Sequence, residues 1–440
     1  MAVKLYSSHK PERTIVGGFL ALIASGALCI WVANASFKPL SFVDALFTAT
    51  SATCVTGLIV VDTGRDLSFI SQWIVLLLIQ LGGIGVMTFT TALPLLAGQR
   101  IGLRQRMLMK GGLGMETPSG AVRLLIQVLK LTVFAEALGV LFLFFAFLQS
   151  DRPLRAAHLA VFHTISAFCN AGFSLFSDNL ESFAATWAVP GIIMALIVAG
   201  GLGFPFYAEV ASSLRTRRKL SPYSKLVVLV TLVLIASGGL LFSVTEWNNA
   251  LKGLSPGLKV WNALFCAVTP RTAGFDTINV NALSSASILL TILLMIVGAS
   301  SGSTGGGVKV TTIGVLFATM WSHLRGREDA VLWGRAISHT VLIRSISMVL
   351  IYLLTLFFSS FILLLIEPFP FRCLVFEVVS ALGTVGLSMG ITGDLSPAGK
   401  LILVALMFWG RVGLLTFMYS LLKKDHEGNV SYPEATFIVG

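Results

Sequence analysis

Eight long apolar runs limit the possible folds of this chain more than any other feature. They lie at about 14–35, 70–97, 124–149, 186–210, 226–245, 284–320, 340–366 and 397–422. A helix needs about 20 apolar residues to cross a bilayer. Only 12% of the residues are charged, against about 25% in soluble domains. The sequence therefore predicts an all-α membrane protein whose first run is an uncleaved signal anchor.

A shorter apolar segment lies within each successive pair of runs. These segments cover about 41–53, 155–169, 257–270 and 370–383, and at about 14 residues they are too short to cross a bilayer. They suit half-helices that enter the membrane and return on the same side. The expected fold is span, re-entrant pore helix, span, used four times around a central ion pore: repeat 1 at 1–123, repeat 2 at 124–225, repeat 3 at 226–339 and repeat 4 at 340–440.

Lys and Arg are unevenly divided between the two sides that this topology defines. Nineteen belong to the termini and to the loops at or beside 98–123, 211–225 and 321–339, and eight to the opposite side. Positive charge marks the cytoplasm, so both termini are expected there. The net charge of +11 is then explained without nucleic acid. The opposite side has eleven acids, including Glu246, Glu367 and Glu377, which form either a cation-concentrating vestibule or scattered solvated charges.

Residues that serve enzymes and metal sites are sparse. The five cysteines form no CxxC pair and the six histidines no HExxH motif, so no zinc site, redox site or enzyme active site is expected. Gly302 and Gly307 have the spacing of a Walker A loop, but Val308 stands where that motif needs lysine, and the context is a membrane segment. ATP binding there is rejected, and no bound cofactor is expected.

The four short segments resemble one another. Each begins with phenylalanine and contains a glycine followed by a large apolar residue: FTATSATCVTGL, FHTISAFCNAGF, FCAVTPRTAGF and FEVVSALGTVGL. The glycines, Gly57, Gly172, Gly274 and Gly386, are 115, 102 and 112 residues apart. Such internal similarity indicates one structural unit used four times.

The chemistry of these segments favours a cation filter. A half-helix that stops in mid-membrane is followed by backbone without helical partners, which persists only where it is buried or lines water. Four such loops around one axis would present rings of carbonyl oxygens to a dehydrating cation, at the partly negative ends of four helices. Glycine permits the φ values that turn successive carbonyls the same way. The alternative, a simple turn after each short helix, suits one loop better than four with the same flanks.

The segment VGASSGSTGGGVKV interrupts the sixth run. It follows the third filter glycine by about 24 residues, which places it just below the filter. We interpret it as a gate; the alternative is a packing motif, which three consecutive glycines suit poorly. The residues assigned to the gate are Gly298, Ser300, Ser301, Gly302, Ser303, Thr304, Gly305, Gly306, Gly307, Lys309 and Arg411.

Three cationic side chains fall at membrane depth, where an unpaired charge is costly. Arg411 is expected to donate to carbonyls of the interrupted segment; the alternative is an arginine that only holds the bundle together. Lys309 is expected to pair with an acid or with carbonyls. Arg271, beside the third filter loop, is expected to turn away from the axis, to pair with Asp276, Asp44 or loop carbonyls, and to brace the filter.

Several motifs together resemble the Trk/Ktr/HKT superfamily of cation transporters, and most closely its KtrB-type potassium-translocating subunits. They are ATSATCVTGLIVVDTG, FHTISAFCNAGFSLF, TPRTAGF, SGSTGGGVK, GTVGL, LGGIGVMTF, WGRVG and the ending YPEATFIVG. The resemblance covers nearly the whole chain. Two departures from the family pattern are Leu414, where many relatives have proline, and Pro205.

This resemblance implies potassium uptake through a gated pore in a bacterial cell membrane, often promoted by sodium. It also implies a homodimer with one pore per subunit and a cytosolic ring of nucleotide-binding regulatory subunits. Gly57 matches the potassium-type members, since relatives with serine there prefer sodium. The filter carbonyls that it implies are those of Val55, Thr56 and Gly57, of Asn170, Ala171 and Gly172, of Thr272, Ala273 and Gly274, and of Thr384, Val385 and Gly386.

Two questions stay open at the level of sequence. The first is whether the chain is a gated conduit or an alternating-access cation symporter, since broken helices also mark carriers; four parallel repeats favour the conduit. The second concerns the basic loops Arg100–Lys110 and Arg215–Lys225. They either dock the cytosolic ring or serve only to set the topology.

Overall fold

The protein is described by a computed structural model that covers residues 11–85, 121–217, 219–327 and 329–413. Its long elements are helices, and its one hairpin joins β1 (Val331–Leu332) to β2 (Arg335–Ala336). The helices are α1 (Pro11–Asn34), α2 (Phe42–Thr53), α3 (Phe69–Ile84), α6 (Ala121–Phe147), α7 (Pro153–Phe168), α8 (Ala188–Gly201), α9 (Phe204–Thr216), α10 (Pro222–Glu246), α11 (Pro256–Val268), α12 (Ser285–Ile296), α13 (Val310–Leu324), α14 (His339–Ile366), α15 (Phe371–Gly383) and α16 (Pro397–Val412).

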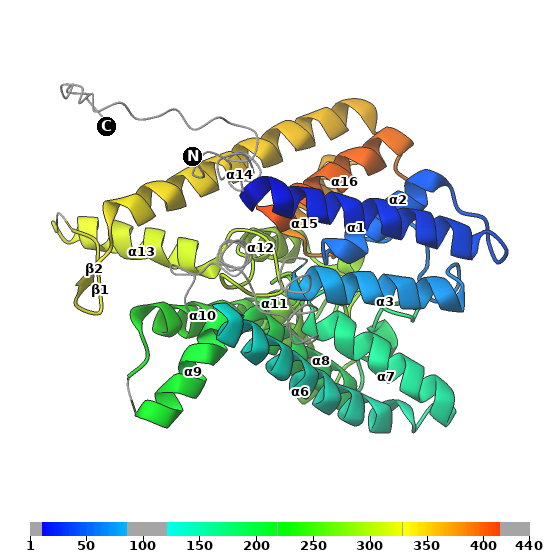
Figure 1. Ribbon diagram of the computed structural model, residues 1–440, viewed down its shortest axis with the longest axis horizontal. Helices are drawn as coiled ribbons and strands as arrows, with labels where there is room; N and C mark the ends of the chain where they lie inside the picture. The colour runs from blue at the N-terminus through cyan, green and yellow to red at the C-terminus, as the bar shows by residue number, and fades with distance from the viewer. Residues whose placement is uncertain (1–10, 86–120, 218, 328, 414–440) are drawn as a thin grey trace, which may run out of the picture.

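The elements close into a ring of four units, each consisting of a long helix, a pore helix and a helix that returns. The limits of the pore helices α2, α7, α11 and α15 lie within two residues of the predicted ones. The returning helix of each unit packs on the pore helix of the next: α3 on α7, α8 on α11, α12 on α15 and α16 on α2. Helices α1 and α16 therefore lie side by side in Figure 1 although they come from opposite ends of the chain.

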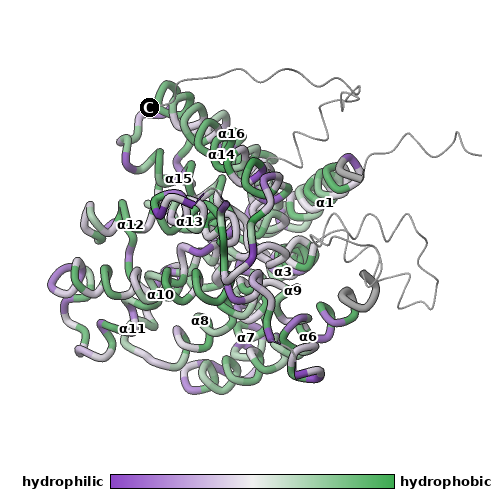
Figure 2. The backbone as a smooth tube through the Cα atoms, turned by 90° about the vertical axis from the view of Figure 1, so that its left-hand side faces the viewer, coloured by the Kyte–Doolittle hydropathy of each residue, from purple (hydrophilic) through white to green (hydrophobic). Residues whose placement is uncertain are grey.

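The long helices provide the membrane spans. Among the described residues, four helices are long and apolar enough to cross a bilayer: α1, α6, α10 and α14. Large side chains on their outer faces are exposed, including Val244 at 72% and Phe357 at 62%. Figure 2, which looks along the bundle, shows hydrophobic segments around the periphery and hydrophilic ones toward the middle. The prediction of an all-α membrane protein is confirmed.

The repeated sequence motif forms the buried centre of each unit. The phenylalanine that opens each motif, at 47, 162, 265 and 376, is fully buried. The apolar residue that follows each glycine is also buried: Leu58, Phe173, Phe275 and Leu387. Packing on both flanks of each loop therefore explains why the four units share the motif.

The predicted continuous span at 186–210 is wrong. Helix α8 ends at Gly201, α9 begins at Phe204, and the two axes meet at 87°. Gly203 between them has φ of +92°, and Pro205 stands in the first turn of α9. Proline lacks the N–H that a continuing helix needs, and it disfavours helical backbone in the residue before it. An apolar run of sufficient length therefore contains a sharp corner.

The returning helix is short in every unit, not only in the third. The predicted interruption of 284–320 is present, but it is longer than Gly298–Gly307, because α12 ends at Ile296 and α13 begins at Val310. The C-cap residues of α3 and α16 are Gly85 and Gly413, with φ of +92° and +90°. The remainder of the predicted spans at 70–97 and 397–422 lies outside the described residues.

A buried polar side chain fixes the start of the returning helix in three units. Asn34, Glu246 and Glu367 close or follow the long helices, and each accepts the backbone N–H of the serine that caps the returning helix. The distances are 2.7 Å from Ser68 to Asn34 and 3.0 Å in the pairs Ser284–Glu246 and Ser396–Glu367. Both glutamates are buried and neither lines the vestibule, so neither alternative given for the outer acids describes them. Glu377 is also buried, and it accepts from the Met389 N–H at 3.0 Å.

We expect Glu367→Ala to lower the free energy of unfolding by about 1–3 kcal/mol, because two donors of Ser396 lose their acceptor in a buried site. The measurement is thermal unfolding of purified protein in detergent. Lys400, in the first turn of α16, donates to Asp44 of α2 at 2.8 Å. Lys400→Met therefore serves as a control that removes a partly exposed ion pair, worth less than about 1 kcal/mol. Equal destabilisation by the two variants would contradict the proposed role of Glu367.

Candidate ion pathway

The four loops that follow the pore helices share one unusual backbone conformation. In each predicted filter triad, the first and third residues have positive φ. The first residues are Val55 (56°), Asn170 (60°), Thr272 (68°) and Thr384 (50°), and the third are Gly57 (97°), Gly172 (70°), Gly274 (75°) and Gly386 (95°). Left-handed backbone is costly for the non-glycine residues, above all for β-branched ones. Its recurrence at four equivalent positions shows that the surrounding packing imposes it.

The pore helices hold these loops by hydrogen bonds. The middle residue of each triad donates its N–H to a carbonyl in the last turn of the helix, at 2.8 Å for Thr56 to Ser51 and 2.8 Å for Val385 to Ser380. Ala171 and Ala273 donate in the same way to Ser166 at 2.7 Å and to Thr269 at 3.0 Å.

Hydroxyl groups at the same four positions secure the outer part of each loop. The hydroxyls of Ser51 and Ser380 accept from the N–H of Gly57 and Gly386 at 3.1 and 3.0 Å. Ser166 and Thr269 donate instead to the carbonyls of Phe173 and Phe275. Sequence reasoning missed this set, although a serine or threonine five or six residues before each glycine was a visible signal.

The four glycines close a ring. A Cβ atom added to Gly57 would lie 2.5 Å from the Ala171 carbonyl oxygen, and one on Gly172 would lie 2.8 Å from that of Ala273. One on Gly274 would lie 2.7 Å from that of Val385. One on Gly386 would meet the Thr56 carbonyl. Each unit thus touches the next in order, and the space between them admits no side chain.

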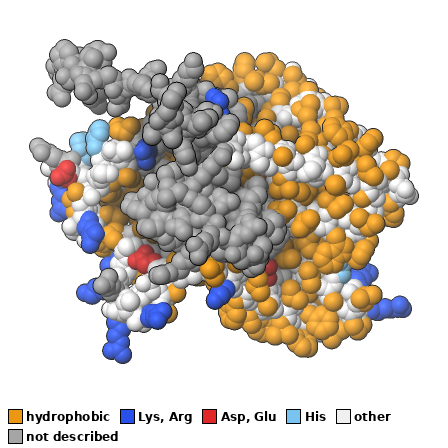
Figure 3. Space-filling model, in the orientation of Figure 1, with side chains coloured by type: hydrophobic (Ala, Val, Ile, Leu, Met, Phe, Trp, Pro, Cys, Tyr) orange, Lys and Arg blue, Asp and Glu red, His pale blue; other side chains and the backbone are white. Residues whose placement is uncertain are grey.

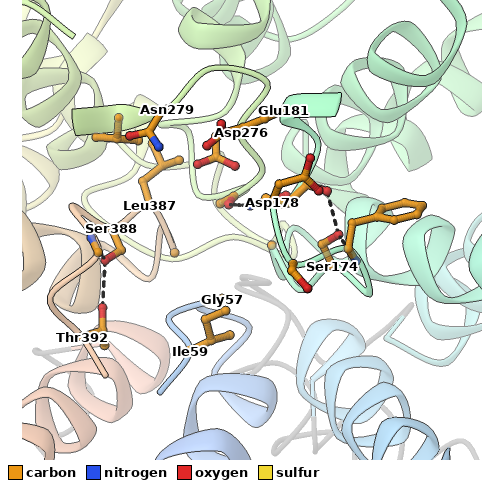
Figure 4. Close-up of a pocket in the computed structure, with 18 of the residues that line it drawn as sticks. Gly57, Ile59, Ser174, Asp178, Glu181, Asp276, Asn279, Leu387, Ser388 and Thr392 are labelled. Carbon is orange, nitrogen blue, oxygen red and sulfur yellow. Dashed lines mark hydrogen bonds between the residues drawn. The ribbon is translucent and has the colours of Figure 1, made fainter. Parts of the chain in front are cut away.

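A cavity of 320 Å³ opens above this ring. The four glycines form its floor, and its walls include Asp178, Glu181 and Asp276. Figure 4 shows Asp276 and Glu181 close together on one side, with Gly57 and Ile59 across from them. The Asn179 side chain donates to the Gly274 carbonyl at 3.2 Å, which ties the wall to the ring. The predicted acidic vestibule therefore contains three of the eleven acids.

The electrostatics of the vestibule depend on Asp276, which lies in the loop between α11 and α12. Burial, followed in size by the nearby carboxylate of Glu181, raises the pKa of Asp276 to about 8. Burial and the charge of Asp178 also raise the pKa of Glu181, while a hydrogen bond from Asn279 lowers it. The vestibule consequently becomes more negative as the pH rises through 8.

The segment predicted as a gate lies against the inner end of the filter triads. A Cβ atom on Gly305 or Gly306 would meet the hydroxyl of Thr272 or Thr384, the first residues of their triads. Thr304 donates its hydroxyl to the Phe168 carbonyl at 3.3 Å. Ala299, Ser300 and Thr304 are fully buried. The segment and the vestibule therefore occupy opposite ends of the ring.

Two of the cationic side chains bind carbonyls of this segment. Lys309 donates to Gly305 at 2.8 Å and to Gly306 at 3.3 Å. Arg411 donates to Thr304 and, at the end of α3, to Gly82 and to Gly83 at 3.1 Å. A guanidinium group offers five donors and no acceptor. Arg411 can therefore join carbonyls of two separate segments.

The third cation, Arg271, has a different partner from the predicted one. Arg271 is buried and points away from the ring, where it donates to the Thr231 hydroxyl of α10 at 3.1 Å. Among the described residues it pairs with neither Asp276 nor Asp44, and Asp44 binds Lys400 instead. The predicted acid partner was wrong, because Arg271 reaches the polar side chain of the long helix behind the filter.

A family model described as TrkH, cation transport protein, matches residues 5–431. The chain belongs to this family. It is 38% identical to the Ktr system potassium uptake protein B of Bacillus subtilis over 98% of this chain and 97% of the relative. It is 36% identical to the potassium/sodium uptake protein NtpJ of Enterococcus hirae, over 98% and 97%.

A solved structure shows the same fold. The potassium transporter TrkH from Vibrio parahaemolyticus superposes with a TM-score of 0.75 at 20% identity, covering 95% of this chain and 86% of that one. The family model and the relatives at 36–38% identity confirm the resemblance to the Trk/Ktr/HKT superfamily and the KtrB-type relationship.

We expect Gly57→Ser to reduce discrimination between potassium and sodium by about tenfold. The added side chain overpacks a rigid site, and a free-energy cost of about 1.4 kcal/mol corresponds to a factor of ten. The reason is the contact with the Ala171 carbonyl. Uptake of each ion by cells that lack other transporters is the measurement. Gly253→Ser is the matched control, since Gly253 also has positive φ but nothing within 4 Å. Unchanged discrimination in Gly57→Ser would remove that residue from the filter.

We expect cation flux at subsaturating concentration to rise between pH 6 and pH 9. The pKa of Asp276 is raised, so its carboxyl is protonated below pH 8 and gains its charge above it. Glu181 and Asp178 are the acidic groups that face it. Flux into proteoliposomes across this range is the measurement. Asp276→Asn should flatten the rise, and an identical profile in that variant would contradict the assignment.

Proposed function

We propose that the chain carries potassium across a bacterial cell membrane through a gated pore lined by backbone carbonyls. The proposal rests on one observation: four equivalent loops meet in a closed ring of glycines. Each glycine lies against a carbonyl of the next unit, and these carbonyls belong to Thr56, Ala171, Ala273 and Val385. Carbonyl rings are what potassium filters use in place of the hydration shell of the ion. The names of the relatives, potassium uptake and potassium/sodium uptake proteins, support the same substrate.

The twelve residues of the four triads are the proposed filter. The positive φ values at the first and third positions orient successive carbonyls, and the Ser and Thr hydroxyls of the pore helices fix them. All four third residues are glycine. We propose that this set favours potassium, with sodium as a promoting ion rather than the main substrate.

The segment Gly298–Gly307, with Lys309 and Arg411, is the proposed gate. The close approach of Gly305 and Gly306 to Thr272 and Thr384, at the inner end of the filter triads, supports this proposal. A packing motif alone would not need donors from several other elements, whereas a plug held by individual hydrogen bonds can be released. Glycine also makes its backbone easy to reshape.

The proposed partners are a second copy of the chain and a cytosolic nucleotide-binding ring. Figure 3 shows Lys and Arg gathered at the left-hand end of the molecule, over α9 and the β1–β2 hairpin, while hydrophobic side chains cover much of the rest. Arg215, Arg217 and Lys219 at this end are exposed. We propose that this end and both termini face the cytoplasm, and that the basic residues bind an acidic surface of the ring.

The function and the gate are tested together in proteoliposomes. The parent protein should admit potassium, and deletion of Ser300–Gly306 should raise basal flux without partner or nucleotide. The deletion is tolerable because Val297 and Val308 already pair at the base of the loop, with Gly298 donating to Val308 at 2.9 Å. Arg411→Ala should raise flux less, since Lys309 still holds the loop. A folded deletion variant no more conductive than the parent would leave the segment as packing.

We expect Arg215→Glu with Arg217→Glu to reduce co-purification with the cytosolic subunit, because reversed charge repels an acidic surface. The effect should weaken as salt is added, since exposed charges more than about 10 Å apart are screened at 0.1 M. Arg152→Glu with Arg155→Glu, exposed at the other end of the molecule, is the control. Undiminished co-purification at low salt with the first pair reversed would show that α9 is not the contact.

A further inference from the structure

Helix α10 reaches the segment Gly298–Gly307 through one hydroxyl group. Tyr223, in the first turn of α10, donates to the Ser301 carbonyl at 2.9 Å and lies 3.4 Å from the Ser300 hydroxyl. This contact is separate from those of Lys309 and Arg411, which bind the carbonyls of residues 304–306. The segment is therefore held at both of its halves, by different elements.

The corner between α8 and α9 supplies two more contacts of the first half. Phe204, the first residue of α9, donates its N–H to the Gly302 carbonyl at 2.9 Å. On the other side of the corner, the Gly201 carbonyl accepts from the N–H of Ser300 at 3.0 Å. The break in the helix leaves these groups without helical partners, and the segment provides them.

Glu209 fixes α9 to the start of α10. Its carboxylate accepts the Ser221 hydroxyl at 2.7 Å, the Ser221 N–H and the Ser224 hydroxyl. Ser221 is the N-cap of α10, two residues before Tyr223. A closed path of contacts therefore runs from Ser301 through Tyr223 and the cap of α10 to Glu209, and back along α9 to Gly302.

We infer that Tyr223 and Glu209 are positioning residues for the gate. Tyr223 holds the Ser301 carbonyl in place, and Glu209 fixes the α9–α10 corner from which both Tyr223 and the Phe204 N–H reach the segment. The inference rests on the proposed function of Gly298–Gly307 as the gate. It adds a second point of attachment, and it connects the gate to an element with an exposed end.

Helix α9 is long enough to transmit a displacement of its exposed end to the segment. Thirteen residues at about 1.5 Å each give a helix of about 20 Å, which has one end at Gly302 and the other at the exposed Arg215 and Arg217. Displacement of the exposed end changes the corner at Glu209, because that carboxylate is the link between the two helices. The contacts of Ser301 and Gly302 then change together.

Tyr223→Phe is the decisive variant, because it removes one hydroxyl and leaves the ring. The loss of one hydrogen bond shifts a two-state equilibrium by about two- to tenfold. Basal potassium flux without partner should rise by that factor, and the ratio of partner-stimulated to basal flux should fall. Tyr207→Phe is the matched control: Tyr207 donates to the Ala199 carbonyl at 2.8 Å, in the same corner but away from the segment. It should change basal flux less than twofold, since Glu209 still holds α9.

Glu209→Gln tests the corner itself. The amide keeps one acceptor oxygen but loses the second and the charge, so basal flux should rise in the same direction. Because both residues act through one corner, the double variant Tyr223→Phe/Glu209→Gln should show less than the product of the two single effects. Purely multiplicative effects would contradict a shared path.

The loop deletion separates failure of this inference from failure of the gate. If the deletion of Ser300–Gly306 or Arg411→Ala raises basal flux while Tyr223→Phe does not, the gate stands and Tyr223 has no part in it. The inference is also wrong if Tyr207→Phe opens the pore as much as Tyr223→Phe. If neither gate variant nor Tyr223→Phe changes flux, the proposed gate is wrong and the inference falls with it. Melting temperatures of all variants in detergent show whether the flux changes follow stability instead.

Discussion

The structure depends on how backbone groups find partners where helices stop inside an apolar environment. An unpaired N–H or carbonyl in hydrocarbon costs several kcal/mol, and this chain stops helices there repeatedly. At the pore helices, serine and threonine hydroxyls and the last-turn carbonyls bind the loops. At the returning helices, the free carbonyls of Gly82, Gly83 and Gly201 are met by Arg411 and by the N–H of Ser300. The segment Gly298–Gly307 is thus both a source of free groups and the partner of groups left free elsewhere.

Fourfold repetition explains the ring but not the gate. Each returning helix stops near the filter, at Ile84, Gly201, Ile296 and Val412. In the second unit a single turn of chain separates the two helices, whereas in the third unit the interruption runs from Val297 to Lys309. Of these two connections, the longer one, in the third unit, lies against the inner end of the filter triads. The difference between the second and third units therefore coincides with the proposed gate, while the glycine ring keeps four equal contributions.

The sequence predicted the pore helices, the glycine positions and the carbonyl contacts of Lys309 and Arg411, because each has a local signal: length, repetition, or a charge in an apolar run. It did not predict the corner at Gly203, since hydropathy reads 186–210 as continuous and gives Pro205 no weight. The partner of Arg271 was also missed, because Thr231 lies 40 residues earlier on another helix and only packing brings the two together. Glu246 and Glu367 were assigned by side of the membrane, although the serine caps that they bind are 38 and 29 residues away, respectively. The functional roles of filter and gate remain proposals that these contacts support.

The number and strength of the contacts on the segment set how a gate of this kind can be controlled. Lys309, Arg411, Tyr223 and the corner of α8 and α9 each contribute individual hydrogen bonds, and each such bond is worth about 0.5–1.5 kcal/mol net, or about 1.5–3 kcal/mol where one group is charged. Moving a two-state element from 1:99 to 99:1 takes about 5.5 kcal/mol of differential binding. A handful of such bonds is of the same size, so a partner can release the segment by weakening a few of them. A single buried ion pair would resist release, because separating it leaves two uncompensated charges. Attachment of Lys309 and Arg411 to carbonyls leaves one charge rather than two without a partner on release, and each freed carbonyl can turn to a cation or to water in the pore.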